Sequence, residues 1–360
     1  MGFGLLGFLN FRNLGDRELD VDARQVLLVG ENGQGKTNLL EAVYLLCVAS
    51  SFRESRDAAL LRDPALPAGL QGRYGSTGSP PHRLSLGWQP GAKKEVRIDG
   101  KAVTDRRDLL RTVLCICFIQ QDLEFVSGPP EARRRFFDQV LALADLSWLD
   151  TFRDYRQVLR ARNLALKARQ NDLLDVYDWQ IAPLGLAIRA RRERLVAEFN
   201  GVFTPLLSGI LGGDVAVRIR YRPSWSGLDS REAVVSRLAA DRAKDLAFGT
   251  TTSGPHRDGF AFTIGGRDFL HFASTGQVRL CALVLRVAQA HFLAERTGRR
   301  PVLLLDDVLL ELDPGRKRAF VERFPEYDQA FFTFLPGENH LSSRGGDALL
   351  LTVEGGEFRT

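Results

Sequence analysis

The sequence has 360 residues with 49 Lys and Arg against 44 Asp and Glu, so its formal net charge is +5. Hydrophobic residues make up 44% and charged residues 26%, which excludes a disordered or fibrous chain and favours roughly two folded domains. No apolar run approaches the roughly 20 residues needed to cross a bilayer, and the first residues lack the basic region and cleavage site of a signal peptide. We therefore expect a cytoplasmic protein with no membrane partner.

The basic side chains are almost all arginine, since lysine occurs at only seven positions. Arginine side chains pair well with phosphate groups, so the composition permits a nucleic-acid partner, although a high-GC genome produces the same bias. The four cysteines lie in apolar runs without paired Cys-x-x-Cys or Cys/His spacing. This favours buried thiols over a metal site or disulfides.

The N-terminal third shows strand patterns and one clear helix. Short, largely apolar segments with turn signals at residues 14–16 between them predict strands over residues 3–8, 17–21 and 25–29. A helix is expected from Lys36 to about Ala49. Further along, Pro, Gly and Ser mark a surface loop over 75–81, and turn residues mark a hairpin within 94–103.

Helical periodicity with abundant charge replaces the strand patterns between Glu131 and about Leu207, with helices expected over 153–171 and 184–203. We interpret this region as an inserted helical arm. After it the sequence predicts a helix over 278–296. Strands are expected over 215–221, 260–264, 302–305, 330–334 and 348–353.

Buried strands that alternate with helices on both sides of the arm favour an α/β fold with a mixed sheet, whose strands come from both ends of the sequence. The predicted domains are residues 1–128, the first half of the sheet domain; 129–212, the helical arm; and 213–360, the second half of the sheet domain.

Residues 30–37, GENGQGKT, match the phosphate-binding pattern G-x-x-x-x-G-K-T between an apolar strand and a helix, which is the context this motif requires. The glycines let successive backbone N–H groups point at phosphate oxygens. Lys36 is expected to reach the β and γ phosphates, and the Thr37 hydroxyl to bind Mg²⁺. The expected ATP-binding residues of this P-loop segment are Gly30, Asn32, Gly33, Gln34, Gly35, Lys36, Thr37 and Asn38.

A second motif is the apolar strand 302–305 followed by two carboxylates, Asp306 and Asp307, which is typical of a Walker B strand. Asp306 is expected to hold Mg²⁺, usually through water. Asp307 is expected to be the catalytic general base that accepts a proton from the attacking water. The alternative, a helix cap, is disfavoured because a P-loop needs such an acidic partner.

A third motif, Phe272-Ala-Ser-Thr-Gly-Gln277, resembles the L-S-x-G-Q signature of ATP-binding-cassette (ABC) ATPases and precedes a helix as that motif does. The resemblance implies that Ser274, Gly276 and Gln277 act in trans, on the nucleotide bound by a second copy of the chain. An ATP-dependent homodimer is therefore expected. Downstream, Asp313 lies where the same proteins have their D-loop.

Further segments extend the resemblance to the RecF recombination-mediator family of bacterial DNA repair, over nearly the whole chain. They are Phe8-Leu-Asn-Phe-Arg-Asn-Leu14, Gly30 to Ala42, Ser51-Phe-Arg53, Phe118 to Leu123, Gly128 to Asp138, Ser253-Gly-Pro-His-Arg-Asp258, and Asp306 to Val308. The resemblance implies an ABC-type ATPase head similar to SMC heads with a short helical arm. It also implies ATP and Mg²⁺ as cofactors, slow hydrolysis, and loading at gapped DNA with the RecO and RecR mediators.

Several positions depart from the family pattern or stay open. Gln120-Gln121 stands where relatives have Pro-Glu, so either glutamine is a candidate Q-loop ligand to Mg²⁺, and we assign Gln121. Thr333 stands at the usual switch histidine position, as is common among RecF relatives; it cannot carry charge, so turnover should rest on Asp307 and be slow. Arg12 is a candidate γ-phosphate contact by resemblance, with a surface arginine as the alternative.

Two other functions compete with an ATP-gated DNA-binding dimer. One is the ATPase subunit of an ABC transporter, which the helical insertion and the RecF-like segments disfavour. The other is a nucleotide-gated scaffold without hydrolysis, disfavoured because Lys36, Thr37, Asp306 and Asp307 are all present. No base-reading motif is visible, so contacts to DNA are expected through the phosphate backbone of a duplex or gap junction.

Overall fold

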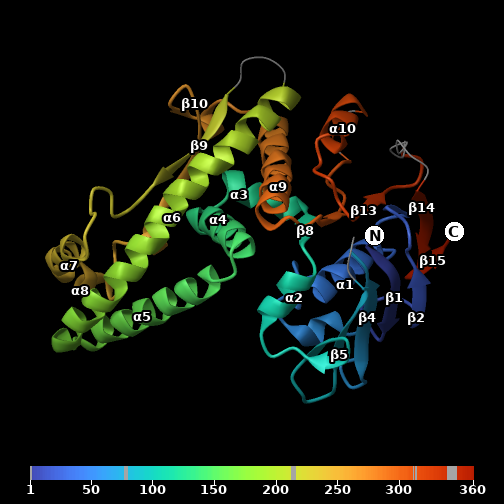
Figure 1. Ribbon diagram of the computed structural model, residues 1–360, viewed down its shortest axis with the longest axis horizontal. Coiled ribbons are helices and arrows are strands. Elements are labelled where there is room, and N and C mark those ends of the chain that lie inside the picture. The colour runs from blue at the N-terminus through green and yellow to red at the C-terminus, as the bar shows by residue number, and fades with distance from the viewer. Residues whose placement is uncertain (1, 77–79, 212–215, 311, 313, 339–346) are drawn as a thin grey trace. The chain divides into compact units, whose positions relative to one another are not determined.

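The computed structural model describes residues 2–76, 80–211, 216–310, 312, 314–338 and 347–360 (Figure 1). Their contacts form two compact units. Unit 1 comprises Met1–Gln121 and Thr297–Thr360, and unit 2 comprises Asp122–Arg296. Unit 1 therefore draws its residues from both ends of the sequence, as expected. Residues 216–296, which we predicted as part of the second half of the sheet domain, group with the arm in unit 2.

The first sheet of unit 1 is antiparallel, with strand order β2-β1-β4-β5-β6-β7. Its strands are β1 (Phe3–Leu9), β2 (Arg17–Asp20), β4 (Ala68–Tyr74), β5 (His82–Trp88), β6 (Glu95–Ile98) and β7 (Lys101–Ala102). The predicted strands at residues 3–8 and 17–21 and the hairpin within 94–103 are confirmed. Strands β4 and β5 were not predicted. Gly72 interrupts the apolar alternation of β4, whereas the alternation of Leu84, Leu86 and Trp88 in β5 was readable from the sequence.

The second sheet of unit 1 is mixed, with strand order β15-β14-β3-β13-β12-β8. Its strands are β3 (Gln25–Val29), β8 (Cys115–Phe118), β12 (Val302–Leu305), β13 (Gln329–Phe334), β14 (Ala348–Glu354) and β15 (Glu357–Arg359). The first five are parallel to their neighbours, and β15 pairs antiparallel with β14. The expected mixed sheet is confirmed, and its parallel strands place their carboxyl ends at one edge.

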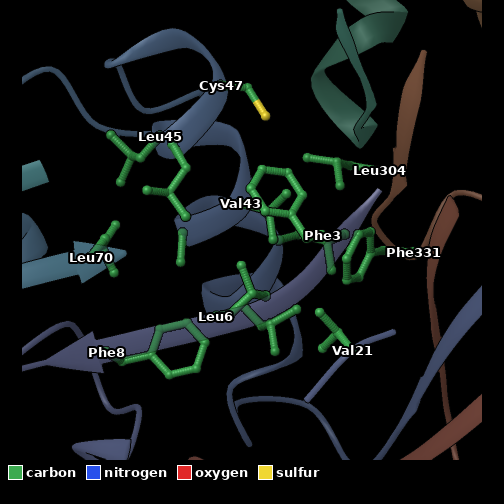
Figure 2. Close-up of a cluster of buried hydrophobic side chains, with 14 of the residues drawn as sticks. Phe3, Leu6, Phe8, Val21, Val43, Leu45, Cys47, Leu70, Leu304 and Phe331 are labelled. Atoms are coloured by element: carbon green, nitrogen blue, oxygen red, sulfur yellow. The ribbon is translucent and has the colours of Figure 1, made fainter. Parts of the chain in front are cut away.

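Helix α1 (Lys36–Val48) contacts strands of both sheets in unit 1 and carries the core between them. Figure 2 shows apolar side chains converging from the two sheets and α1, among them Phe3, Leu6, Val43, Leu304 and Phe331. Burial of α1 on most of its surface fixes the P-loop that precedes it. The other helices of unit 1 are α2 (Arg106–Thr112) and α10 (Pro314–Val321), with 3-10 turns at Asp57–Leu60 and Gln120–Leu123, the latter running into unit 2.

Unit 2 is mainly helical and contains a three-stranded antiparallel sheet of order β11-β10-β9. Its helices are α3 (Glu124–Ser127), α4 (Pro130–Ala144), α5 (Trp148–Ala168), α6 (Asn171–Leu211), α7 (Arg231–Ala240), α8 (Arg242–Phe248) and α9 (Thr275–Thr297), the last ending just past the unit boundary. Its strands are β9 (Val217–Arg222), β10 (Gly259–Ile264) and β11 (Arg267–Asp268), and its 3-10 turns are Pro255–Arg257 and Phe269–His271.

The arm differs from expectation in one respect. Helix α6 runs unbroken through Pro183 and Pro205, where we predicted a helix over 184–203 alone. A proline removes one helical hydrogen bond. The helix persists because its buried face packs along its length, for example where Phe203 meets Phe262 of β10.

A buried ion cluster joins α5, α6 and α8 within unit 2. Arg162 is fully buried; its Nε donates to Asp178 at 2.6 Å and its Nη1 to Asp245 at 2.7 Å. Buried ions need such partners to offset the loss of hydration. Aromatic packing joins the sheet to the helices, with the rings of Phe137 and Phe260 stacked at 4.2 Å.

Candidate functional site

The candidate site lies at the edge of the mixed sheet where the parallel strands end. The P-loop follows β3, Asp306 and Asp307 follow β12, and Thr333 lies near the end of β13, between those two strands. Ligands of open α/β sheets bind at this edge. The structure thus brings both predicted nucleotide motifs together from positions far apart in the sequence.

The P-loop turns into α1 through residues with positive φ. Gly33 has φ 80° and Gly35, the residue before the helix, has φ 119°. These conformations favour glycine, and they leave the first N–H groups of α1 without helical partners and directed toward the loop. Lys36 is buried, and its Nζ donates to the carbonyls of Gly30 and, at 3.0 Å, Glu31. The ammonium group is therefore held within the loop.

Residues from the far end of the chain brace this loop. The Gln34 carbonyl accepts the N–H of Gly356 at 2.8 Å, and its Oε1 accepts the N–H of Gly355 at 2.6 Å. Gly30 packs so closely on β14 that a Cβ there would lie 2.4 Å from the Val353 carbonyl. The brace was missed from the sequence, because its two sides are more than 300 positions apart. A nucleotide contact by Gln34 stays a prediction.

The second group of site residues joins α1 to β12. The Thr37 hydroxyl donates to Asp306 Oδ1 at 2.7 Å. Burial raises the pKa of Asp306 to about 6; the bond from Thr37 opposes this shift, and the charge of Asp307 adds to it. A hydroxyl beside a carboxylate is a donor set that suits Mg²⁺, which takes few protein ligands and fills its other positions with water and phosphate oxygens.

No cluster of three or more His, Cys, Asp or Glu that suits a metal occurs within the described ranges. A divalent ion at Thr37 and Asp306 would therefore need the oxygens of a bound nucleotide as well. The proposed third ligand, Gln121, is exposed and lies in the 3-10 turn that is separated from β8 by one residue, as does Gln120, which is also exposed. The assignment of Gln121 rather than Gln120 as the Mg²⁺ ligand stays a prediction.

Asp307 is held by Thr333 of the neighbouring strand. The Thr333 hydroxyl accepts the backbone N–H of Asp307 at 2.7 Å and donates to its Oδ1 at 2.8 Å. Asp307 also has φ 53°, an uncommon value for a residue with a side chain. The residue at the switch position thus fixes the orientation of the predicted base, a contact that the sequence motifs did not specify.

Arg12 and Arg53 converge on a buried carboxylate of α1, Glu41. Arg12 Nε donates to Glu41 at 2.9 Å, and Arg53 and Ser51 also donate to it. Burial alone would raise the pKa of Glu41, but these hydrogen bonds together hold it below its ordinary value. A nucleotide contact by Arg12 stays a prediction, because its guanidinium is engaged here.

A pocket of about 170 Å³ lies between the P-loop, Arg53 and Asp307. It is lined by Glu31, Asn32, Gly33, Gly35, Lys36, Thr37, Asn38, Arg53 and Asp307. Arg53 was missed as a site residue, although the segment Ser51–Arg53 was noted from the sequence. A larger hollow of about 520 Å³ lies elsewhere in unit 1, against β6 and β7, and contains none of the motif residues.

The signature segment belongs to unit 2 and begins α9. Ser274 and Gln277 form a capping box, since the Gln277 N–H donates to Ser274 Oγ at 3.3 Å and the Ser274 N–H to Gln277 Oε1 at 2.9 Å. Both residues and Gly276 are exposed. A Cβ on Gly276 would meet nothing within 4 Å. The segment is therefore an open helix N-terminus. The predicted D-loop residue, Asp313, lies outside the described residues.

The two units and the motif order define an ABC-type P-loop ATPase head with an inserted helical arm. The model of the family described as RecF/RecN/SMC N terminal domain matches residues 5–336. A protein of Treponema pallidum named DNA replication and repair protein RecF is 41% identical over 331 residues, 92% of this chain and 93% of that protein. A Leptospira interrogans protein of the same name is 32% identical over 328 residues, 90% of this chain and 89% of that protein.

Solved structures agree with the sequence relatives. A structure described as the recombination mediator protein RecF-ATP in RecFOR pathway has TM-score 0.87 and 28% identity, and covers 99% of this chain and 97% of that one. An SMC head bound to the C-winged helix domain of ScpA has TM-score 0.59 at 14% identity, covering 100% of this chain and 96% of that one, and shows the fold alone. The chain belongs to the RecF/RecN/SMC family and, within it, to the RecF group.

Within the described ranges, no helix combines the length and apolar character that a membrane span needs.

Proposed function

We propose that this protein binds ATP with Mg²⁺, hydrolyses it slowly, and uses the nucleotide to control a DNA-binding dimer in recombinational DNA repair. The observation that carries the proposal is the joining of the P-loop, the Thr37–Asp306 pair and the Asp307–Thr333 pair at one sheet edge. The names of the relatives support the repair role over the transporter alternative.

Binding rests on the loop and the helix that follows it. The N–H groups at the start of α1 and the Lys36 ammonium meet the charge of the phosphate groups, while Arg53 lines the same pocket. Mg²⁺, when bound, neutralises charge on the phosphates and on the leaving group. Thr37 and Asp306 are the residues that would hold it.

Hydrolysis rests on Asp307. With one carboxylate oxygen held by the Thr333 hydroxyl, the other is available to accept a proton from the attacking water. A carboxylate is a weak base near pH 7, which fits slow turnover of the kind expected for a switch rather than a metabolic enzyme.

The dimer and the partners complete the proposal. Ser274, Gly276 and Gln277 offer an exposed helix N-terminus that suits the γ-phosphate held by a second copy. The related structure is described as part of the RecFOR pathway, which supports RecO and RecR as partners. Loading at gapped DNA is part of the same proposal and rests on the family resemblance alone. We place the protein in the cytoplasm on the same grounds.

The experiment that tests the nucleotide site is titration of a fluorescent ATP analogue into Lys36→Ala. Losing a charge-assisted phosphate contact should weaken binding about tenfold to hundredfold, from roughly 1.5–3 kcal/mol. The matched control is Lys101→Ala, which removes an exposed lysine of β7 in the same unit and should bind normally. Equal affinity of Lys36→Ala and the control would remove the P-loop from the proposed function.

A further inference from the structure

Strand β9 carries three arginines on one face. The burial of its residues alternates, so that Val217 and Ile219 are buried while Arg218, Arg220 and Arg222 are exposed. Side chains two positions apart share a face and lie about 6.6–6.8 Å apart along a strand. The three guanidinium groups therefore form a row about 13 Å long, which we call the β9 row.

The β9 row lacks the ion-pair partners that some other surface arginines of unit 2 have. Arg153 pairs with Asp150 at 2.9 Å, and Arg237 pairs with Asp241 at 2.8 Å. No side chain of the β9 row makes a hydrogen bond, ion pair or cation–π contact with any residue that the structure describes. Three like charges in line repel one another, so an anionic partner would stabilise this face.

The β10 residues beside the row have short side chains. Register places Gly259, Ala261 and Thr263 of β10 directly opposite the three arginines, on the same face. Ala261 and Thr263 are buried, whereas the three arginines are exposed, so a ligand would meet the guanidinium groups rather than the β10 side chains. Asp268 of β11 continues the row opposite Thr263, but its carboxylate accepts the N–H of Leu270.

Side chains of α6 form hydrogen bonds with the edge of β9 that does not pair with β10. Asn200 of α6 donates to the Ile219 carbonyl at 2.8 Å and accepts the Ile219 N–H at 2.8 Å. Thr204 donates to the Val217 carbonyl at 3.0 Å. These contacts occupy the middle of this edge, which disfavours pairing with an added peptide strand and leaves the exposed face for a partner.

We propose that the β9 row is a contact site for the phosphate backbone of duplex nucleic acid. This inference rests on the proposed DNA-binding function and adds its location. A 13 Å length of duplex carries about four phosphates on each strand, enough to meet three guanidinium groups. The six residues of this face include no aromatic side chain, so they offer no stacking platform for the bases of a single strand.

The test replaces all three arginines of the β9 row with glutamine in the full chain. Binding of a labelled duplex is measured by anisotropy with ADP present, from about 50 to about 200 mM salt. Loss of three phosphate contacts should make the slope of log K against log[salt] less negative by about 2.7, and lower the affinity several hundredfold near 0.1 M. ATP-analogue binding, which belongs to unit 1, should not change.

Two matched variants separate position from charge. Arg153→Gln, Arg237→Gln and Arg296→Gln together remove the same charge from exposed, ion-paired arginines of unit 2 and should keep the wild-type slope. The triple lysine variant of the β9 row should also keep it, because ammonium groups neutralise phosphates too.

The outcomes distinguish this inference from the function on which it rests. If the glutamine variant keeps the wild-type affinity and slope, the β9 row is not the contact, although the protein still binds DNA. The same conclusion follows if the control triple loses as much, or if the lysine variant fails like the glutamine variant. If the wild type itself shows no salt-dependent binding of duplex with ADP or with a slowly hydrolysed ATP analogue, the proposed DNA-binding function and the β9 row both fall.

Discussion

Thr333 is the residue through which the proposed catalytic base can be perturbed without touching the nucleotide. Thr333→Val keeps the β-branched shape and removes only the hydroxyl. Thr333 is buried, with 3% of its surface exposed. Its hydroxyl makes hydrogen bonds of 2.7 and 2.8 Å to Asp307. Lys36 and Thr37 have other partners, so ATP affinity should stay within about twofold of wild type.

The expected size follows from the two bonds. The one to the carboxylate is worth roughly 1.5–3 kcal/mol, as hydrogen bonds to charged groups are. If orientation of Asp307 depends on it, hydrolysis should slow about tenfold to hundredfold, since each 1.36 kcal/mol is a factor of ten in rate. The partly buried N–H of Asp307 also loses its acceptor, which should lower stability by less than the about 1–3 kcal/mol expected for a fully buried group.

The assay is single-turnover hydrolysis at saturating ATP, with binding measured in parallel. Thr112→Val is the matched control, because its hydroxyl donates only to the Asp108 carbonyl on α2. The double variant with Asp307→Asn should hydrolyse no more slowly than Asp307→Asn alone. A Thr333→Val variant with wild-type turnover, or an equal further loss in the double variant, would refute the view that Thr333 acts through Asp307.

Two further predictions concern unit 2. Ser274→Arg should abolish the ATP-induced dimer seen by light scattering, while a single chain still binds ATP. Ser274→Thr, which keeps a hydroxyl able to cap α9, should still dimerise. A dimer of the arginine variant contradicts the trans signature. Burial, with the charges of Arg257 and Arg134, lowers the pKa of His256 to about 4, from about 6.5 in the unfolded chain. The contribution of neutral His256 to the stability of the fold is therefore present above about pH 6.5 and is lost as the pH falls toward 4. In urea unfolding, the free energy of unfolding of the wild type should fall by up to about 3 kcal/mol more than that of His256→Gln between about pH 6.5 and pH 4. Equal decreases in the two proteins would contradict this assignment.

Local patterns were sufficient to predict the parts of the site that are contiguous in sequence. The strand over 25–29 and the helix from Lys36 were predicted within one residue. The apolar run of the strand, the glycines of the loop and the start of the helix follow one another directly in the sequence. The strand over 302–305 was also predicted correctly, since a fully apolar run ending in two acids has few other structural explanations.

Contacts between distant segments were not predictable in the same way. The Gly355-Gly356 turn meets Gln34, and no local property of either segment indicates the other. The continuity of α6 through Pro183 depends on packing that overrides the local penalty of proline. One missed feature was readable: the spacing S-x-x-Q at 274–277 is that of a capping box, and it indicates where α9 begins.

The proposed ATP site and the proposed DNA site lie in different units, which determines how ATP binding and DNA binding can affect each other. The P-loop belongs to unit 1, whereas the signature and the β9 row belong to unit 2, and each has its own supporting contacts. If the signature acts on the nucleotide of a second copy, ATP brings two β9 rows into one assembly, and their combined contribution to the salt slope rises from about 2.7 to about 5.4. Linkage requires that DNA then tighten ATP binding by the factor by which ATP tightens DNA binding. A steeper salt slope with ATP than with ADP would thus report dimerisation itself, and Ser274→Arg should give the ADP slope with either nucleotide.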